Sequence, residues 1–266
     1  MTPASPQGAH LSRPRASEQI FADLQDRILL GEFARGERLP TERELAAAYG
    51  VSVNTVRESV RALSLMGMVE VRHGSGAFVT ASTSGLVGQS VGRLLRFERT
   101  GLADVVRLSG VLHQYAATRA VDTADETDID AFDDAVTAIS AQGGGRWVQL
   151  GAAVESFLQA FVACAHDPLL SALSATLDHI VVAVTTQIAV DEPGDLASQT
   201  AGLAGVRAAM ITALRRRDAS ALLAATSEYH ARSAAIIAEH PALRHVRLSD
   251  PRWSPLLTGL IATTRP

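Results

Sequence analysis

Apolar positions recur at helical spacing along most of the chain, and a strand-like pattern appears in one short stretch. Residues 16–30 are predicted to form an amphipathic helix, because Ile20, Leu24, Ile28 and Leu29 recur at helical spacing. Residues 68–79 are rich in Val and contain a Gly-rich break, a pattern typical of two short strands joined by a turn. The N-terminal region therefore combines helices with one hairpin.

Between these two segments, residues 39–66 predict two helices joined by a tight turn. Thr41 and Glu44 have the spacing of a capping box, which marks a helix start. Gly50 tolerates the left-handed conformation that ends a helix. Ser52 is suited to cap the next helix. This order of signals predicts a helix-turn-helix.

The second of these helices has an apolar face and a polar face. Val56, Val60 and Leu63 recur at helical spacing and are expected to point inward. Short polar side chains and arginines on the opposite face are what reading of the DNA major groove requires. The outward set is Asn54, Thr55, Arg57, Glu58 and Arg61.

An ordinary helical hairpin with a solvated charged face would give the same pattern. The flanks favour DNA binding, because a helix precedes the pair and a hairpin with its turn at His73–Gly76 follows it. Together these elements predict a winged helix-turn-helix over residues 17–80.

The N-terminal region resembles the DNA-binding domain of GntR-type bacterial transcription regulators. The runs PTERELA, SVNTVRESVRAL and HGSG occur in the family's order and spacing, and the resemblance covers essentially all of residues 17–80. It implies a homodimer that places two recognition helices in successive major grooves of a palindromic double-stranded operator. Repression is the usual outcome in the family. The DNA-contacting positions it implies are Arg43, Ser52, Asn54, Thr55, Arg57, Arg61, His73 and Gly74.

The charge balance excludes a generally basic nucleic-acid coat protein. The formal net charge is −4, and residues 1–80 carry nine arginines and nine acids, hence no net charge. DNA affinity is therefore expected to come from a few well-placed arginines, with modest nonspecific binding that salt weakens.

The sequence indicates a cytoplasmic protein. The single cysteine, Cys164, excludes an intrachain disulfide and is expected to be a buried small residue. Residues 1–16 lack the apolar run of a signal peptide and are predicted to be a disordered arm. No run is expected to be long and apolar enough to cross a membrane.

The second half is predicted to be an all-helical bundle over residues 86–240, after a linker at 81–85 and before a tail at 241–266. Thr123 and Glu126 have capping-box spacing, and Asp167 precedes a proline at a helix start. The expected helices are 86–98, 101–121, 125–142, 146–165, 168–190, 195–217 and 219–239. The predicted fold class is mainly α, with an N-terminal winged helix-turn-helix and a C-terminal effector-binding bundle.

This half resembles, more weakly, the FCD-type effector domain of the FadR-like branch of GntR regulators. Many relatives hold a metal ion there, and their ligand positions correspond here to Val154, Leu158, Arg207, and either Tyr229 or His230. Val and Leu cannot bind a metal, and Arg stays protonated. We therefore expect no metal and no cofactor.

Two interpretations of the bundle stay open. In the first, it binds a small metabolite, a carboxylate or acyl compound, with Arg207 as the anion anchor. The candidate effector-binding residues are Arg107, His113, Arg207, Tyr229 and His230. In the second, the domain has lost its ligand, and Arg207 is a solvated or ion-paired surface residue.

A rival hypothesis from another class is a serine hydrolase. Residues 88–92 match the G-x-S-x-G pattern, which would make Ser90 the nucleophile. That motif requires a preceding strand and a following helix, whereas here it follows a predicted linker. An enzyme is therefore not expected.

Overall fold

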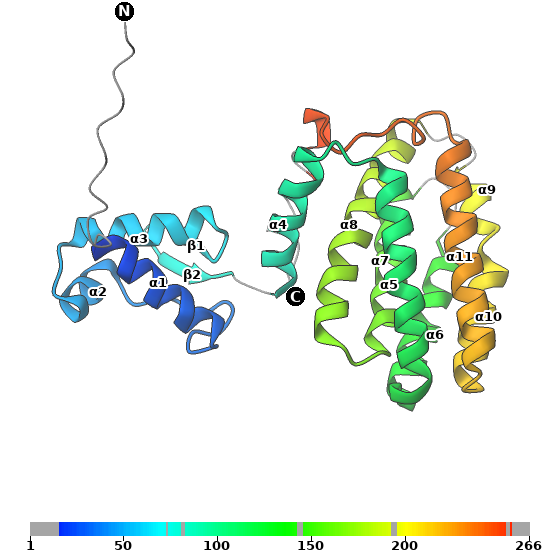
Figure 1. The fold of residues 1–266 in the computed structure, drawn as a ribbon, viewed down its shortest axis with the longest axis horizontal. Helices are drawn as coiled ribbons and strands as arrows, with labels where there is room; N and C mark the ends of the chain where they lie inside the picture. Colours follow the sequence, from blue (N-terminus) through cyan, green and yellow to red (C-terminus); the bar gives the residue numbers. More distant parts are fainter. Residues whose placement is uncertain are drawn as a thin grey trace, which may run out of the picture. The chain divides into compact units, whose positions relative to one another are not determined.

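The computed structural model describes residues 16–72, 74–80, 83–142, 146–192, 196–253 and 256. The chain divides into two compact units, Met1–Ser82 and Thr83–Pro266. The fold class predicted from the sequence is confirmed: a winged helix-turn-helix is followed by an all-helical domain (Figure 1).

The first unit contains α1 (Ala16–Leu29), α2 (Glu42–Tyr49), α3 (Val53–Leu65), β1 (Val69–Arg72) and β2 (Gly76–Val79). The two strands pair antiparallel, with Val69 opposite Val79. A third extended segment joins them, because the amides of Gly36 and Leu39 donate to the carbonyls of Val79 and Ala77, each at 2.8 Å.

Most of the predicted apolar positions of the first unit form its core, but Leu29 at the end of α1 is exposed. The side chains of Leu24, Val56 and Leu63 are fully buried, which ties α1 to α3. The remaining core side chains are Ile20, Ile28, Phe33, Leu39, Leu45, Ala46, Val60, Met68, Val69 and Val79.

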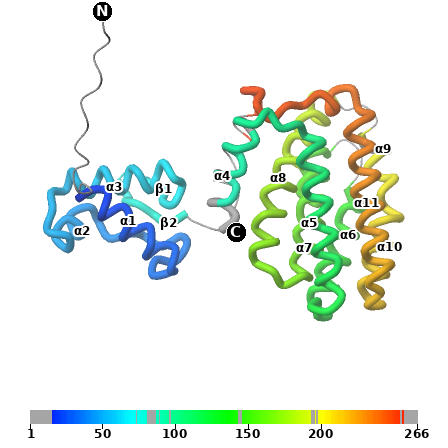
Figure 2. The backbone as a smooth tube through the Cα atoms, in the orientation of Figure 1, coloured from blue at the N-terminus to red at the C-terminus, as the bar shows by residue number. Residues whose placement is uncertain are grey.

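The second unit is a bundle in which α8 contacts α4, α5 and α7, and α11 contacts α5 and α10 (Figure 2). Its buried apolar side chains form two clusters, one around Phe132, Phe157 and Phe161 and the other including Leu102 and Trp253. The elements are α4 (Thr83–Phe97), α5 (Leu102–Thr123), α6 (Glu126–Ser140), α7 (Trp147–Ala163), α8 (Pro168–Asp191), α9 (Leu196–Ala201), α10 (Ala204–Arg215), α11 (Ala219–Glu239) and the 3-10 turn η1 (Pro251–Trp253).

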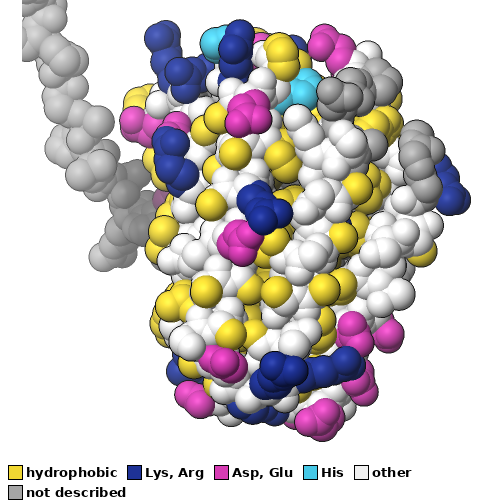
Figure 3. All heavy atoms as spheres, turned by 90° about the vertical axis from the view of Figure 1, so that its right-hand side faces the viewer, with side chains coloured by type: hydrophobic (Ala, Val, Ile, Leu, Met, Phe, Trp, Pro, Cys, Tyr) yellow, Lys and Arg dark blue, Asp and Glu magenta, His cyan; other side chains and the backbone are white. Residues whose placement is uncertain are grey.

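One face of the bundle, on the side of α10 and α11, shows how its surface charge is distributed (Figure 3). Most charged side chains on this face lie toward its two ends, and the surface between them is largely uncharged. An exposed ion pair on α11 joins Arg232 to Glu228, one helical turn apart. Pairs of this kind contribute little to stability, so the bundle depends on its two apolar clusters.

The first part of the predicted tail packs on this bundle. Leu243, Val246 and Leu248 are buried in the second apolar cluster. The amide of Leu102 donates to the Val246 carbonyl at 3.3 Å, and the amide of Leu248 donates to the Thr100 carbonyl at 3.0 Å.

Two local predictions are wrong. The helix expected over 195–217 is broken near Gly202 into α9 and α10. The capping box expected at Thr123 lies two residues further on: the Asp125 side chain accepts from the Asp128 amide, and the Asp128 carboxylate accepts from the Asp125 amide, both at 2.9 Å. Thr123 instead ends α5, and its hydroxyl donates to the Cys164 carbonyl at 2.7 Å.

The sequence-based expectation was that no segment is long and apolar enough to cross a membrane. By length and composition alone, helix α8 contradicts that expectation. Helix α8 has 24 residues and a mean hydropathy of 1.5 over its most apolar window. Half of that window is buried within the bundle, and α8 contacts three other helices. Its apolar character therefore fits a core helix.

The hydrolase hypothesis is contradicted at Ser90. The G-x-S-x-G run lies inside α4, so a helix rather than a strand precedes the serine. The Ser90 side chain is exposed, and the flanking Gly88 and Gly92 are buried. A nucleophile elbow needs a sharp turn between a strand and a helix, and a continuous helix does not provide one.

Candidate DNA-binding surface and effector cavity

The start of α3 is fixed by the capping chemistry that its sequence predicts. Ser52 caps the helix by accepting from the Thr55 amide, and the two hydroxyl oxygens lie 2.8 Å apart. Before it, Thr41 and Glu44 form the expected capping box of α2, and Gly50 closes that helix with a φ of 66°. These caps set the register of the two helices, and with it the outward face of α3.

The polar face of α3 is exposed as predicted. Asn54, Arg57 and Arg61 are exposed, whereas Thr55 is partly covered beside the cap. Arg57 is not free: its Nη2 lies 2.8 Å from Glu42 Oε2, and its Nη1 donates to Asn54 Oδ1 at 3.1 Å. These contacts hold the Arg57 guanidinium across the first turn of α3, next to Asn54, which is also predicted to contact DNA bases.

The wing lies between β1 and β2. Gly74 is exposed with a φ of 72°, a conformation that suits glycine. His73 lies outside the described residues, so its predicted contact stays a prediction. Arg43, on α2, is exposed as a phosphate contact requires.

Two further arginines near the wing were missed by the sequence reasoning. Arg38 lies against the wing: a Cβ added at Gly76 would come within 2.8 Å of its Nε. The guanidinium of Arg72 stacks on Phe78, with its central carbon 4.6 Å from the ring centre. Only the pairing of residues 36–39 with β2 reveals Arg38 as a wing residue, so sequence spacing gave no signal for it.

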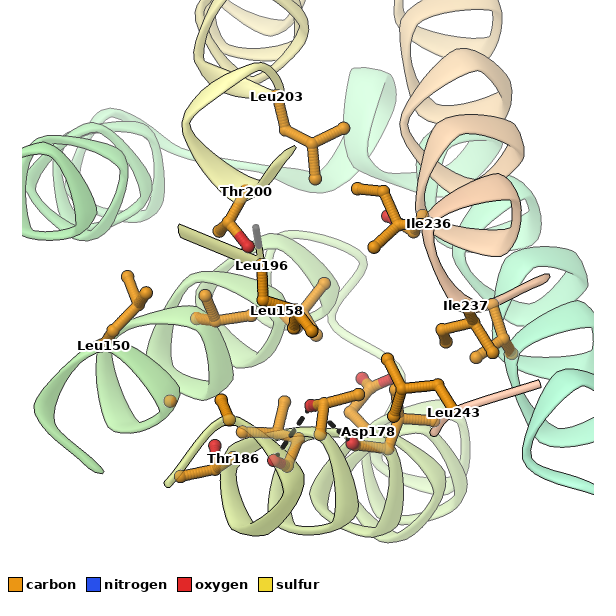
Figure 4. Close-up of a pocket in the computed structure, with 18 of the residues that line it drawn as sticks. Leu150, Leu158, Asp178, Thr186, Leu196, Thr200, Leu203, Ile236, Ile237 and Leu243 are labelled. Carbon is orange, nitrogen blue, oxygen red and sulfur yellow. Dashed lines mark hydrogen bonds between the residues drawn. The ribbon is translucent and has the colours of Figure 1, made fainter. Parts of the chain in front are cut away.

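The second unit contains a partly open cavity of about 130 Å³ between its helices. Leu150 and Leu158 of α7 lie on one side, Asp178 and Thr186 of α8 on another, and Ile236 of α11 faces them (Figure 4). The rest of the wall comes mainly from α5, α9 and α10, together with other residues of α7, α8 and α11.

The positions that correspond to metal ligands in related effector domains all line this cavity. Val154, Leu158, Arg207, Tyr229 and His230 are among its wall residues. In the part of the chain that the structure describes, no group of three or more His, Cys, Asp or Glu side chains could hold a metal ion. The residues present do not fit a metal ion, because two of the positions are aliphatic and one is cationic.

Arg207 is buried, with 2% of its surface exposed. Its Nη2 donates to the Thr200 carbonyl at 3.2 Å, whereas its Nη1 is buried without a hydrogen-bond partner. Burial lowers the pKa of this guanidinium, and the nearby Tyr229 opposes that shift. The alternative in which Arg207 is a surface residue is therefore wrong.

A chain of buried hydrogen bonds lies beside the cavity. Asp178 Oδ2 is 2.9 Å from His113 Nε2, and His113 Nδ1 is 2.8 Å from His230 Nε2. Burial lowers the pKa of His230 to about 3, so that ring is neutral at physiological pH. Sequence reasoning missed Asp178, although an acid inside the apolar run of α8 was a visible signal.

The candidate effector residues are not all brought to the cavity. Arg207, Tyr229 and His230 line it, and His113 is buried behind the wall between Asp178 and His230. Arg107 is exposed on α5 and forms an ion pair with Asp104, so it does not reach the cavity. Its predicted effector contact has no geometric support.

Comparison with known proteins places the first unit in a family. Residues 16–79 match the family described as bacterial regulatory proteins, gntR family. An uncharacterized HTH-type transcriptional regulator of Mycobacterium tuberculosis is 45% identical over 67 residues, which are 25% of this chain and 28% of that protein. The HTH-type transcriptional repressor NanR of Citrobacter rodentium is 34% identical over 119 residues, 42% of this chain and 46% of that protein.

These matches cover less than half of the length of either relative. Among solved structures, the GntR protein of Streptococcus agalactiae has a TM-score of 0.64 and 19% identity, over 82% of this chain and 99% of that one. This likeness shows a common fold that includes the helical domain. The N-terminal helix-turn-helix domain, residues 16–79, thus matches the gntR family of bacterial regulatory proteins.

Proposed function

We propose that this protein is a transcription regulator, expected to be a repressor, that binds a palindromic operator as a homodimer. The observation that carries the proposal is the exposed polar face of α3, capped at Ser52 and presenting Asn54, Arg57 and Arg61. Arginine pairs well with guanine edges and phosphates, and asparagine pairs with adenine. The NanR relative is a transcriptional repressor by name, which agrees with this role.

A dimer is needed because one domain offers few positive contacts. Residues 1–80 have no net charge, so a single α3 gains little from general electrostatic attraction. Two copies of α3 on half-sites about one helical turn apart double the specific contacts. The candidate contacts are Arg43, Ser52, Asn54, Thr55, Arg57, Arg61, His73 and Gly74.

We further propose that the helical unit binds a small anionic effector, a carboxylate or an acyl compound, without a metal ion. The support is the buried guanidinium of Arg207, a residue that lines the cavity. Its Nη1 atom has no hydrogen-bond partner. An anion there would supply the missing acceptor. Tyr229 and His230 stand next to it on α11.

Effector binding would alter DNA binding if the effector prefers one of two arrangements of the dimer. A regulator of this kind works in the cytoplasm and catalyses no reaction. The alternative within this proposal is a regulator whose helical domain binds no effector.

Footprinting tests the proposal directly. The purified full-length protein is applied to its own upstream DNA and to neighbouring promoters, alone and with carboxylates, acyl thioesters or divalent metal ions. A protected palindrome that one carboxylate or acyl compound releases supports the whole proposal. A palindrome that none of them releases supports the ligand-free alternative. Absence of any footprint contradicts a DNA-binding role for α3.

A further inference from the structure

We propose that the cavity binds a compact, mostly apolar monocarboxylate that carries a second hydrogen-bonding group, a hydroxyl or an amine. Arg207 would anchor the carboxylate, and Ser109 would contact the second group. This inference rests on the proposed effector function, because it names the ligand class of the same site. Four features of the cavity carry it.

The first feature is size. The cavity volume is about 130 Å³, and a cavity of about 150 Å³ lined by aliphatic side chains holds a benzene molecule. By that comparison the cavity itself takes about six non-hydrogen atoms, and a ligand of roughly eight or nine would extend into its open side. Only the acyl chain of a coenzyme A thioester could enter this space, and a thioester has no free carboxylate for Arg207 to bind, which favours the free acid over the acyl alternative.

The second feature is the wall. Leu150, Val154 and Leu158 give α7 an aliphatic surface toward the cavity, and α11 adds Ile236 and Ile237 (Figure 4). Some hydroxyl groups in the wall are already engaged, since Thr185 donates to the Val181 carbonyl and Ser233 to the Tyr229 carbonyl, each at 2.8 Å. A polyhydroxylated sugar acid would leave many of its own groups unpaired here, which is costly.

The third feature is a pair of unsatisfied polar atoms. Among the described residues, five buried side-chain nitrogen or oxygen atoms have no hydrogen-bond partner, and two of them are in residues that line the cavity. These two are Arg207 Nη1 on α10 and Ser109 Oγ on α5. Buried polar groups without partners are rare in folded proteins and call for an explanation. One ligand with two polar ends would satisfy both.

The fourth feature is the buried carboxyl group of Asp178. Ser109 lies one helical turn before His113, which is buried behind the wall and hydrogen-bonds Asp178, and Ser109 and Asp178 both line the cavity. A carboxylate on the ligand is attracted to Arg207, whereas a second carboxylate beside the Asp178 carboxyl group would be unfavourable, because two carboxyl groups at one site resist ionising together. A hydroxyl or amine suits this end, because each has a hydrogen to donate.

The test measures binding by isothermal titration calorimetry with the full-length protein and three probes of matched shape. These are 4-methylpentanoate, 2-hydroxy-4-methylpentanoate and leucine, which share a branched apolar body and differ only in the second group. We expect the hydroxy acid or leucine to bind about tenfold more tightly than 4-methylpentanoate, the scale of one net hydrogen bond. Gluconate, glutarate and octanoyl-coenzyme A should bind more weakly than all three.

Two variants and a control locate the site. Arg207→Met should weaken binding of every matched probe by at least tenfold, while Ser109→Ala should abolish the difference between 4-methylpentanoate and its hydroxy derivative. Arg215→Gln is the control on the same helix, because Arg215 is exposed and pairs with Asp133. If Arg207→Met fails to fold, the Ser109→Ala comparison still tests whether the ligand binds in this cavity with its second polar group at Ser109.

Several results would overturn the inference. They are tighter binding of gluconate, glutarate or the thioester, undiminished binding by Arg207→Met, an unchanged preference in Ser109→Ala, and no binding by any matched probe. Footprinting without ligand separates this inference from the proposed function. A footprint without probe binding removes only the ligand assignment, and probe binding without a footprint removes only the DNA-binding role.

Discussion

Arg57 of α3, the proposed recognition helix, is held by Glu42 of α2, with 2.8 Å between Nη2 and Oε2. Both side chains are partly exposed, so this ion pair contributes little to stability. Its consequence lies in recognition. The guanidinium is oriented before DNA arrives, and a DNA base or phosphate must compete with the Glu42 carboxylate for it.

Replacing Arg57 by Ala is expected to reduce specific operator affinity by roughly 1–3 kcal/mol for each half-site, because a bidentate contact is lost. Fluorescence anisotropy with the footprinted operator and a scrambled sequence measures the effect. Glu58→Ala is a matched control on the same exposed face. If Arg57→Ala keeps full affinity and sequence preference, the assignment of α3 as the recognition helix is wrong.

Replacing Glu42 by Gln tests the competition directly. The variant removes one negative charge next to Arg57 and weakens the internal pair, so DNA affinity should rise by about 0.5–1 kcal/mol per protomer at low salt. The increase should diminish as salt is added. Glu18→Gln, on α1, controls for the change in overall charge. A fall in affinity would mean instead that Glu42 is needed to position Arg57.

Burial of His230 should make the helical unit sensitive to acid. Its pKa is about 3 in the folded protein and about 6.5 when exposed in the unfolded chain. The unfolded state therefore binds the proton more readily, and stability that is complete above pH 6.5 is lost progressively toward pH 3.

Between pH 7.5 and pH 5, this one group should remove on the order of 2 kcal/mol from the free energy of unfolding. Urea denaturation of wild type and His230→Asn at both pH values measures it. The variant should lose less stability on acidification. Equal losses in the two proteins would show that His230 is not held neutral in the fold.

Features that depend on local signals could be predicted from the sequence. Thr41, Glu44, Gly50 and Ser52 act within four residues of their partners, so the caps of α2 and α3 were predictable. The helical periodicity gave most of the bundle for the same reason. At Thr123 two acceptable capping boxes overlapped, and the structure uses the one at Asp125.

The parts that sequence did not reveal depend on contacts between distant segments. His113 and His230 are 117 positions apart, and His113 and Asp178 are 65 apart, so no spacing rule joins them. The ion pair of Arg57 with Glu42 spans 15 positions and two helices. Whether Arg207 was buried or exposed likewise depended on how α10 packs, which a single sequence leaves open.

Cys164 should resist thiol reagents in the folded state. Its side chain is fully buried, and burial raises the pKa of the thiol to about 12. The reactive thiolate is therefore almost absent at pH 8. Labelling by a maleimide should be slow in buffer and fast in denaturing urea, followed by mass spectrometry. Rapid labelling without urea would show that α7 opens locally near its end.

Replacing Arg207 by Met should stabilise the ligand-free protein. The guanidinium is buried, its Nη1 has no acceptor, and burial lowers its pKa, so holding this charge inside the bundle costs free energy. Met fills similar space without a charge, as in other proteins where buried ionic groups have been replaced by apolar ones. We expect a gain of about 1–2 kcal/mol, or a few degrees in the melting temperature measured by calorimetry. Arg215→Met, at an exposed ion pair on the same helix, should change the stability little.

A stabilised Arg207→Met variant that no longer binds the matched carboxylates would mean that the native protein gives up stability to keep a binding group ready. A clear loss of stability would instead assign Arg207 a structural role through its bond to Thr200 and its contact with Tyr229.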